Sequence, residues 1–195
     1  MAALSRFISR LGEKALPLYR LLRRTEHFEW TDAATAGLEE IKAILATNPI
    51  LATPNIREPM LLYIAATHQV VSAVLVVERE TDGHKFPLQK PVYYVSTVLT
   101  PCKSRYPHYQ KISYAVFMAS RKLRHYFQER SITVASEVRL NNIINNRDAT
   151  GRIAKWAIEL LPFDIIYKPQ QAIKSQVLAD FVAEWTEAVP KEYGA

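Results

Sequence analysis

The stretch LLYIAATHQVVSAVLVV, residues 61–77, decides how the rest of the chain is interpreted. Apolar and β-branched residues fill both of its ends, and the polar triplet Thr67-His68-Gln69 interrupts it. Short apolar runs on both sides of a polar break predict two strands, over residues 60–66 and 70–80. In many nucleases and phosphotransferases a carboxylate on such a first strand holds a metal ion. Here the strand carries Ala65 and no acidic residue.

Further strands and helices are expected on both sides of this hairpin. After a turn at Asp82-Gly83, three more strands are predicted, over residues 91–99, 131–136 and 163–167. Helical periodicity predicts segments over residues 105–128, 138–146, 151–161 and 173–186. The order from residue 60 is then β-β-β-α-β-α-β-α, with the middle helix in two pieces. This order predicts an α/β (α+β) fold, a five-stranded mixed sheet flanked by helices.

The periodicity also divides the chain into three regions. Residues 1–55 are expected to form a helical N-terminal segment, with a second helix beginning near Pro17 and a third helix capped by Thr31 and closed before Pro49. Residues 56–187 form the sheet domain, and residues 188–195 form a C-terminal tail or linker.

Composition narrows the class of protein. The chain has 195 residues, of which 49 % are hydrophobic and 23 % are charged, which is typical of a globular protein. No run reaches the roughly 18 apolar residues that a membrane span needs, so no membrane partner is expected. With Cys102 as its one cysteine and without a secretory signal at its start, the chain is expected in a reducing compartment, the cytoplasm or the nucleus.

The formal net charge of +6 favours an acidic partner, and nucleic acid is the commonest one. Basic residues concentrate in two places. The first 24 residues hold six of them against the single acid Glu13, and a second cluster follows in the long predicted helix. Local clusters favour a phosphate-facing surface. We therefore predict nucleic-acid contacts at Arg23, Arg24, Arg121, Lys122 and Arg124.

Three longer motifs give the chain a likeness to a known family. They are FEWTDAATAGLEEIKAILATNPILATPN at residues 28–55, PVYYVSTVLTPCKSRYPHYQK at residues 91–111 and GRIAKWAIELLPFDIIYKPQQAIKSQVLADFVAEW at residues 151–185. In this order they resemble the ribonuclease H domain of gypsy-type retrotransposon reverse transcriptases, especially those of plant elements, and the segment that leads into it from the polymerase. The likeness covers about residues 3–187 and implies a ribonuclease H-like fold.

The resemblance implies a site of four carboxylates that hold two magnesium ions. The motifs that carry these acids in the family fall here on IAAT, QKISYA, ASEVRL and ADF. The four positions are therefore Ala65, Ile112, Ser136 and Asp180, and only Asp180 is acidic.

One carboxylate cannot hold two magnesium ions, so we expect no catalytic residue, no bound metal and no cofactor. Glu137 lies one residue from the third position and would point elsewhere from an extended backbone. Asp180 is interpreted as a solvent-facing acid on an amphipathic helix.

Three functions remain open at this point. The first is a catalytically inactive, connection-type domain in a reverse transcriptase polyprotein, which acts as a scaffold and contacts an RNA–DNA hybrid or other nucleic acid. The second is a stand-alone, repurposed retroelement product that binds a host protein. The third is residual ribonuclease H activity. Only the first two agree with the loss of three acidic residues.

Overall fold

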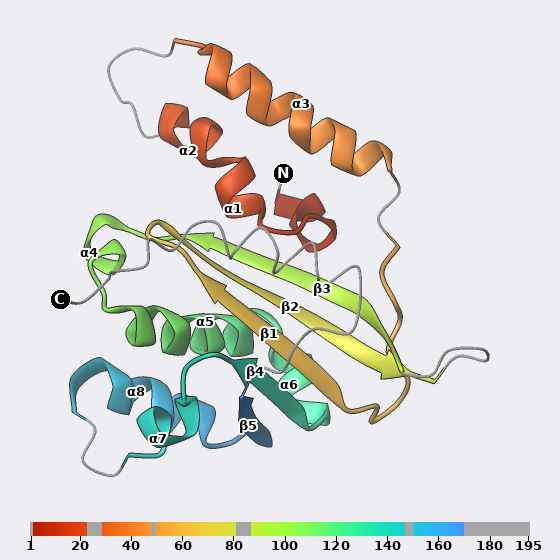
Figure 1. The fold of residues 1–195 in the computed structure, drawn as a ribbon, viewed down its shortest axis with the longest axis vertical. Coiled ribbons are helices and arrows are strands. Elements are labelled where there is room, and N and C mark those ends of the chain that lie inside the picture. Colours follow the sequence, from red (N-terminus) through yellow and green to blue (C-terminus); the bar gives the residue numbers. More distant parts are fainter. Residues whose placement is uncertain (1, 23–28, 48–49, 81–86, 147–149, 170–195) are drawn as a thin grey trace, which may run out of the picture.

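The structure is a computed structural model that describes residues 2–22, 29–47, 50–80, 87–146 and 150–169 (Figure 1). The turn expected at Asp82-Gly83, the closing helix over 173–186 and the tail over 188–195 lie outside these residues. Within the described helices, none combines the length and the apolar character that crossing a membrane requires.

Five strands form one mixed sheet. They are β1 (Met60–Ala66), β2 (Val70–Arg79), β3 (Leu88–Val98), β4 (Ile132–Ser136) and β5 (Ile165–Pro169). Their spatial order is β3-β2-β1-β4-β5, with β1, β2 and β3 antiparallel and β4 and β5 parallel to β1. The predicted five-stranded mixed sheet is confirmed, and the strand that carries Ala65 lies at its centre.

The two faces of the sheet carry different side chains because successive residues of a strand point to opposite sides. Ile64 and Ala73 belong to the main core, which packs against α5 (His108–Lys122), and we call this side the α5 face. Tyr63, Ala65 and Val74 form a separate buried cluster on the other side. The N-terminal helices lie over part of that other side (Figure 1), and we call it the α1 face.

The single helix expected over residues 105–128 is wrong, since the chain forms two helices there, α5 (His108–Lys122) and α6 (Arg124–Glu129). A short helix, α4 (Pro101–Ser104), comes before them. Pro107 takes an extended conformation immediately before α5, and Leu123, with φ −112° and ψ 30°, interrupts the helix before α6. Leu123 is nevertheless 1 % exposed, so core packing holds the break in place.

The later helices cover the same face. The expected two-piece helix is confirmed as α7 (Leu140–Ile144) and α8 (Gly151–Leu160). Trp156 of α8 packs against Phe117 and Tyr114 of α5, with ring centroids 6.0 and 5.6 Å apart. Residues 111–120 of α5 are all buried, so α5 runs between the sheet and α8.

The N-terminal helices form a small core of their own. They are η1 (Ala2–Phe7), α1 (Leu11–Lys14), α2 (Leu16–Leu22) and α3 (Asp32–Ala46). Ile8, Leu11, Leu18 and Ile41 are buried together in it. The predicted cap at Thr31 is confirmed, because its side chain accepts a hydrogen bond from the Ala34 N–H at 3.3 Å.

Two strand boundaries differ from the expected ones. β3 begins at Leu88, not at Pro91, because Pro91 lies on the edge strand, where a residue without an N–H is tolerated. β5 begins at Ile165, two residues later than expected. Phe163 instead ends α8 with a turn and packs its ring against Phe127, with centroids 5.6 Å apart.

Candidate functional site

Ala65, at the first position of the implied carboxylate site, lies on the α1 face and is 3 % exposed. It pairs with Ser72, and Ser72 pairs in turn with Ser96, so the three side chains form one row across β1, β2 and β3. The two serine hydroxyls lie 3.0 Å apart, and Ser96 Oγ accepts a hydrogen bond of 2.9 Å from the main-chain N–H of Gly12. The row is therefore packed and closed by α1 at its β3 end.

Ile112, at the second position, lies near the start of α5 and is 1 % exposed. It belongs to the main core between α5 and the sheet. The side chain that stands where the family has a glutamate thus stabilises the fold by burying apolar surface.

Ser136, at the third position, is the last residue of β4 and is 3 % exposed. Its Oγ accepts a hydrogen bond of 3.0 Å from the Val138 N–H, so it stabilises the turn that leaves the strand. Ala135 belongs to the cluster on the α1 face, so alternation turns Ser136 toward the α5 face. The structure places Ile112 and Ser136 on one side of the sheet and Ala65 on the other.

The neighbouring acid Glu137 points into solvent. Its side chain is 64 % exposed, and its Oε1 lies 2.7 Å from Nε2 of His108 at the start of α5. Asp180, the fourth position, lies outside the described residues.

These side chains do not fit a pair of magnesium ions, which need several anionic oxygens converging on one place. Ala65 and Ile112 have no side-chain oxygen, and the neutral hydroxyl of Ser136 already has a partner. In the described part of the chain, no three His, Cys, Asp or Glu side chains come together as a set of metal ligands.

A pocket of about 330 Å³ opens where β4 and β5 end. This is the edge of an open α/β sheet at which ligands commonly bind. Ser136 and Tyr167 line the pocket, and burial raises the pKa of the Tyr167 phenol to about 12. Its described polar and charged lining also includes Glu137, Arg139, Asn141, Asn142 and Lys168. Amide, cationic and phenolic side chains, with the single carboxylate of Glu137, thus surround the position where the family has its third acid.

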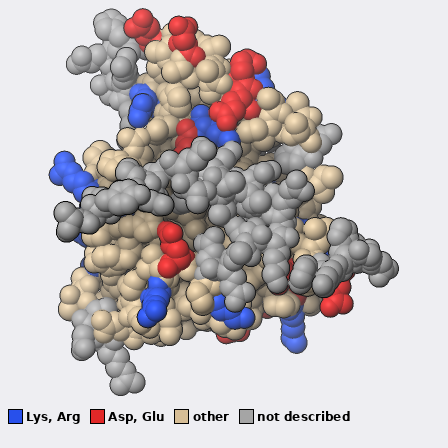
Figure 2. Space-filling model, in the orientation of Figure 1, with Lys and Arg blue, Asp and Glu red and all other residues tan. Residues whose placement is uncertain are grey.

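The predicted basic cluster does not face in one direction. Arg121 points toward α8, where its Nε lies 4.0 Å from Oε2 of Glu159, and its guanidinium stands 5.6 Å from the ring of Phe117. Lys122 points toward β3 instead, and Arg124 is exposed at the start of α6. On the face that Figure 2 shows, basic and acidic side chains are interspersed over the described surface. Arg23 and Arg24 lie outside the described residues.

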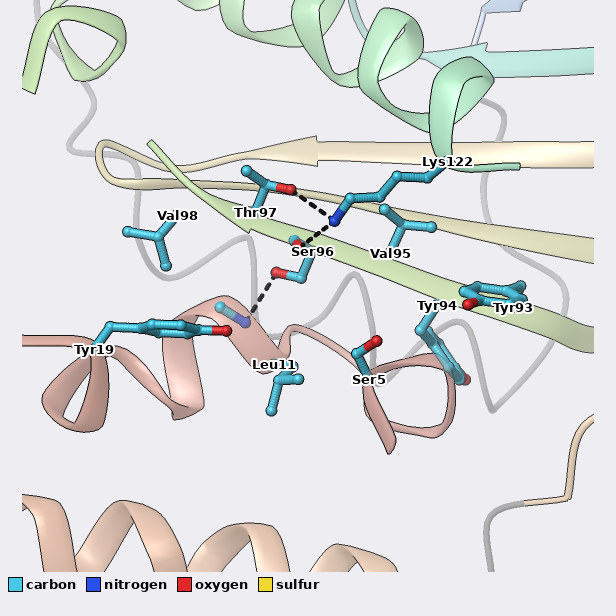
Figure 3. Close-up of a pocket in the computed structure, with 11 residues that line it drawn as sticks. Ser5, Leu11, Tyr19, Tyr93, Tyr94, Val95, Ser96, Thr97, Val98 and Lys122 are labelled. Atoms are coloured by element: carbon cyan, nitrogen blue, oxygen red, sulfur yellow. Dashed lines mark hydrogen bonds between the residues drawn. The ribbon is translucent and has the colours of Figure 1, made fainter. Parts of the chain in front are cut away.

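A second hollow, a groove of about 540 Å³, follows the outer edge of β3 (Figure 3). Figure 3 shows Leu11 and Tyr19 of the N-terminal helices on one side of β3 and Lys122 on the other. Nζ of Lys122 donates to the Ser96 carbonyl at 3.3 Å and to Thr97 Oγ1 at 3.2 Å. Lys122 is exposed as a whole, and desolvation by the neighbouring chain lowers the pKa of its ammonium group.

Neither this groove nor the contact that borders it was predicted from the sequence. Two signals in the sequence pointed there. Pro91 within a strand indicates an edge strand, and Gly12 between apolar helical positions indicates a close approach. A Cβ atom on Gly12 would lie 2.6 Å from Ser96 Oγ and 2.8 Å from Val70 Cγ1. The sequence alone does not indicate that Gly12 packs against Ser96 of β3.

Comparison with known proteins gives a family and a set of relatives. The family model described as "RNase H-like domain found in reverse transcriptase" matches residues 30–134. Curated relatives include the Transposon Tf2-3 and Tf2-4 polyproteins of Schizosaccharomyces pombe, each 26 % identical over 196 residues. These alignments cover 97 % of this chain and 14 % of each polyprotein, so the chain spans about one seventh of their length.

Solved structures share the fold. The foamy viral protease-reverse transcriptase dRH in complex with double-stranded DNA superposes with a TM-score of 0.69 at 20 % identity, over 88 % of this chain and 30 % of that one. The foamy viral protease-reverse transcriptase in complex with an RNA/DNA hybrid superposes with a TM-score of 0.68 at 22 % identity, over 88 % of this chain and 23 % of that one. At this identity the likeness concerns the fold.

Proposed function

Since this chain belongs to the family of RNase H-like domains found in reverse transcriptases, we propose that it is a catalytically inactive, connection-type member of that family. In this role it is part of a retrotransposon polyprotein, holds neighbouring parts together and contacts an RNA–DNA hybrid without cutting it. The 26 % identity to transposon polyproteins over almost the whole chain supports a retrotransposon origin. The three motifs of the sequence support a gypsy-type element, of the kind found in plants.

The observation that carries the proposal is what occupies the three described carboxylate positions. Ile112 fills the core, Ala65 lies in a closed row of small side chains, and Ser136 stabilises the turn after β4. Each replacement has a structural role of its own. A domain that retained cleavage would need anionic oxygens that converge on one face of the sheet to hold its metal ions. Ala65 lies on the α1 face, and its neighbour Ile64, which shares the α5 face with Ile112, is apolar as well.

Contact with nucleic acid is proposed on charge and on fold. The formal net charge of +6 favours a polyanion, and Arg121 and Arg124 are exposed close to the break between α5 and α6. Foamy viral enzymes of this fold were solved with double-stranded DNA and with an RNA/DNA hybrid. We assign the same kind of ligand to this chain, bound through its phosphates.

A titration with a fluorescent 20-base-pair RNA–DNA hybrid tests the proposal. Anisotropy is measured at 50 and 200 mM salt, with magnesium and with EDTA, and gel electrophoresis follows the integrity of the RNA strand. We expect binding at low salt, a loss of affinity of about tenfold or more at high salt, and intact RNA in all conditions. An active ribonuclease H serves as the positive control for cleavage.

Two results would overturn the proposal in different ways. Magnesium-dependent cleavage that copurifies with the domain would establish residual nuclease activity. No binding at 50 mM salt would favour a stand-alone product that binds a host protein. Ile158 and Leu161 at the end of α8, which are 65 % and 75 % exposed, are apolar surface that such a partner could cover.

A further inference from the structure

The outer edge of β3 presents main-chain groups whose direction follows from the register. The Leu99 N–H donates to the carbonyl of Gln69 at 2.7 Å, and the pairs continue inward as Val98 with Val70 and Thr97 with Val71. In an antiparallel pair, hydrogen-bonded and non-hydrogen-bonded positions alternate. The residues that bond to β2 are therefore Tyr93, Val95 and Thr97. The residues whose N–H and C=O groups point away from the sheet are Tyr94, Ser96 and Val98.

Two contacts already cover parts of this edge. The Pro91 carbonyl accepts a hydrogen bond of 2.7 Å from the Ala52 N–H, and the Ser96 carbonyl accepts one from Lys122. Among the described residues, none pairs with the outward N–H groups of Tyr94, Ser96 and Val98. An edge strand with unpaired main-chain groups is a template for another strand.

The groove gives such a strand two different walls. Side chains of an added strand would point alternately to the two faces of the sheet. On the α1 face they meet Leu11 and Tyr19, and on the α5 face they meet Lys122 (Figure 3). The first wall combines the edge of Leu11 with the ring of Tyr19 and the polar side chain of Ser5, and the second carries an ammonium group.

The charge of the groove indicates the chemistry of its occupant. Lys122 is the one charged side chain among the described residues that line it. Its ammonium group donates hydrogen bonds to the Ser96 carbonyl at 3.3 Å and to the Thr97 hydroxyl at 3.2 Å. No carboxylate of the described residues forms an ion pair with it within 4.0 Å. An ammonium group that has only neutral partners gains from a carboxylate.

We propose that the groove along β3 binds an extended, acidic peptide segment of a partner protein, which adds to β3 as a sixth strand. The segment pairs with the outward main-chain groups of Tyr94, Ser96 and Val98, directs apolar side chains toward Leu11 and Tyr19, and places a carboxylate at Lys122. A second copy of this chain fits less well, because pairing β3 with its own copy around Ser96 would bring two Lys122 side chains together.

The probe is a fluorescein-labelled peptide of eight residues that alternates threonine and valine, with one central threonine replaced by glutamate. Its valines lie on one side of the extended chain and its glutamate on the other, as the two walls require. Binding is measured by anisotropy, and hydrogen exchange of the main-chain amides is followed by NMR. We expect added protection at Tyr94, Ser96 and Val98 and little change at Tyr93, Val95 and Thr97, which already pair with β2.

Matched variants test the two halves of the proposal separately. Lys122→Met keeps the long side chain and removes its charge, and it should weaken binding of the glutamate peptide about fivefold. The same substitution should leave binding of a glutamine version of the peptide nearly unchanged. Arg121→Met, on the neighbouring residue that faces α8, is the control and should leave both affinities unchanged. A peptide N-methylated on alternate residues, in the register that faces β3, should not bind.

Four outcomes would overturn the proposal. One is an absence of binding at millimolar peptide. Another is binding without protection of the outward amides, which would place the peptide elsewhere. The third is protection of these same amides by the RNA–DNA hybrid instead of the peptide, which would assign the groove to nucleic acid. Dimerisation of the free chain through β3, seen by sedimentation, would replace the peptide by a second copy and count against it as well.

Discussion

The main-chain N–H of Gly12 donates a hydrogen bond to the side-chain oxygen of Ser96, 84 positions further along the chain. This bond joins the N-terminal helices to the edge strand of the sheet. It also requires that residue 12 has no side chain, because a Cβ atom there would lie 2.6 Å from Ser96 Oγ.

Gly12→Ala should therefore separate α1 from the sheet. We expect the free energy of unfolding, measured in urea, to fall by about 1–3 kcal/mol, since the added methyl group meets both Ser96 and Val70. Ala33→Ser, on the exposed side of α3, is the control and should change stability by less than about 0.5 kcal/mol. Equal stability of Gly12→Ala and the wild type would show that α1 does not pack as described.

Ile112→Glu restores an acidic residue at a family position and should unfold the domain rather than repair a metal site. The side chain is 1 % exposed within the main core. Burying an unpaired carboxylate there should cost at least about 3 kcal/mol, whereas Ile112→Val should cost about 1 kcal/mol. Thermal and urea unfolding measure both variants. A stable Ile112→Glu protein whose melting temperature rises with magnesium would contradict this account of the site.

Glu58 and Arg79 should make stability depend on pH. Arg79 donates to both carboxylate oxygens of Glu58, at 2.8 and 2.9 Å, and the Asn55 N–H donates to one of them at 2.7 Å. These hydrogen bonds lower the pKa of Glu58 from 4.5 to about 2, and the bond from Arg79 has the largest effect.

A lowered pKa means that the contribution of the pair is fully present above pH 4.5 and is lost as the pH falls toward 2. Glu58→Gln should lower the free energy of unfolding by about 1–2 kcal/mol at pH 7. The difference from the wild type should shrink as the pH falls from 4.5 to 2. A difference that stays constant over this range in urea unfolding would show that the ion pair is not its source.

Arg121→Glu and Arg124→Glu test where nucleic acid would bind. Each reversal should weaken binding of the RNA–DNA hybrid by about tenfold at 50 mM salt, with a smaller effect at 200 mM, if the residue contacts phosphate. Lys42→Glu, at an exposed position of α3, is the control for net charge. If all three variants lose affinity equally, the effect comes from total charge and the end of α5 is not the contact.

The strands were predictable because their signal is local. β-branched and apolar runs separated by polar turns predicted the bounds of β1 and β2 to within one residue. Thr31, a residue type that favours the N-cap, predicted the start of α3. The break at Leu123 was not predictable in this way, because leucine favours helices and only the surrounding core holds it in another conformation.

The candidate site shows the same limit. The motifs supplied the positions Ala65, Ile112 and Ser136, but the pairing of β1 with β4 decides which face each side chain takes. Spacing grouped Arg121 with Lys122, yet neighbouring residues of a helix point about 100° apart, and the two side chains reach α8 and β3 respectively. The edge of β3 became visible as a groove only when the N-terminal helices and α5 were placed on its two sides.

The place of β1 in the middle of the sheet also has a consequence for synthesis on the ribosome. β1 ends at Ala66, and its parallel neighbour β4 does not begin until Ile132. At translation rates of about 5–20 residues per second, roughly 3–13 seconds pass between the synthesis of β1 and that of β4. During this time the edge of β1 that later pairs with β4 has no partner strand. A ribosome that stalls in this interval leaves an open apolar edge that chaperones and aggregation compete for. We therefore expect synonymous codons between the two strands to change the yield of folded protein without changing any residue of it.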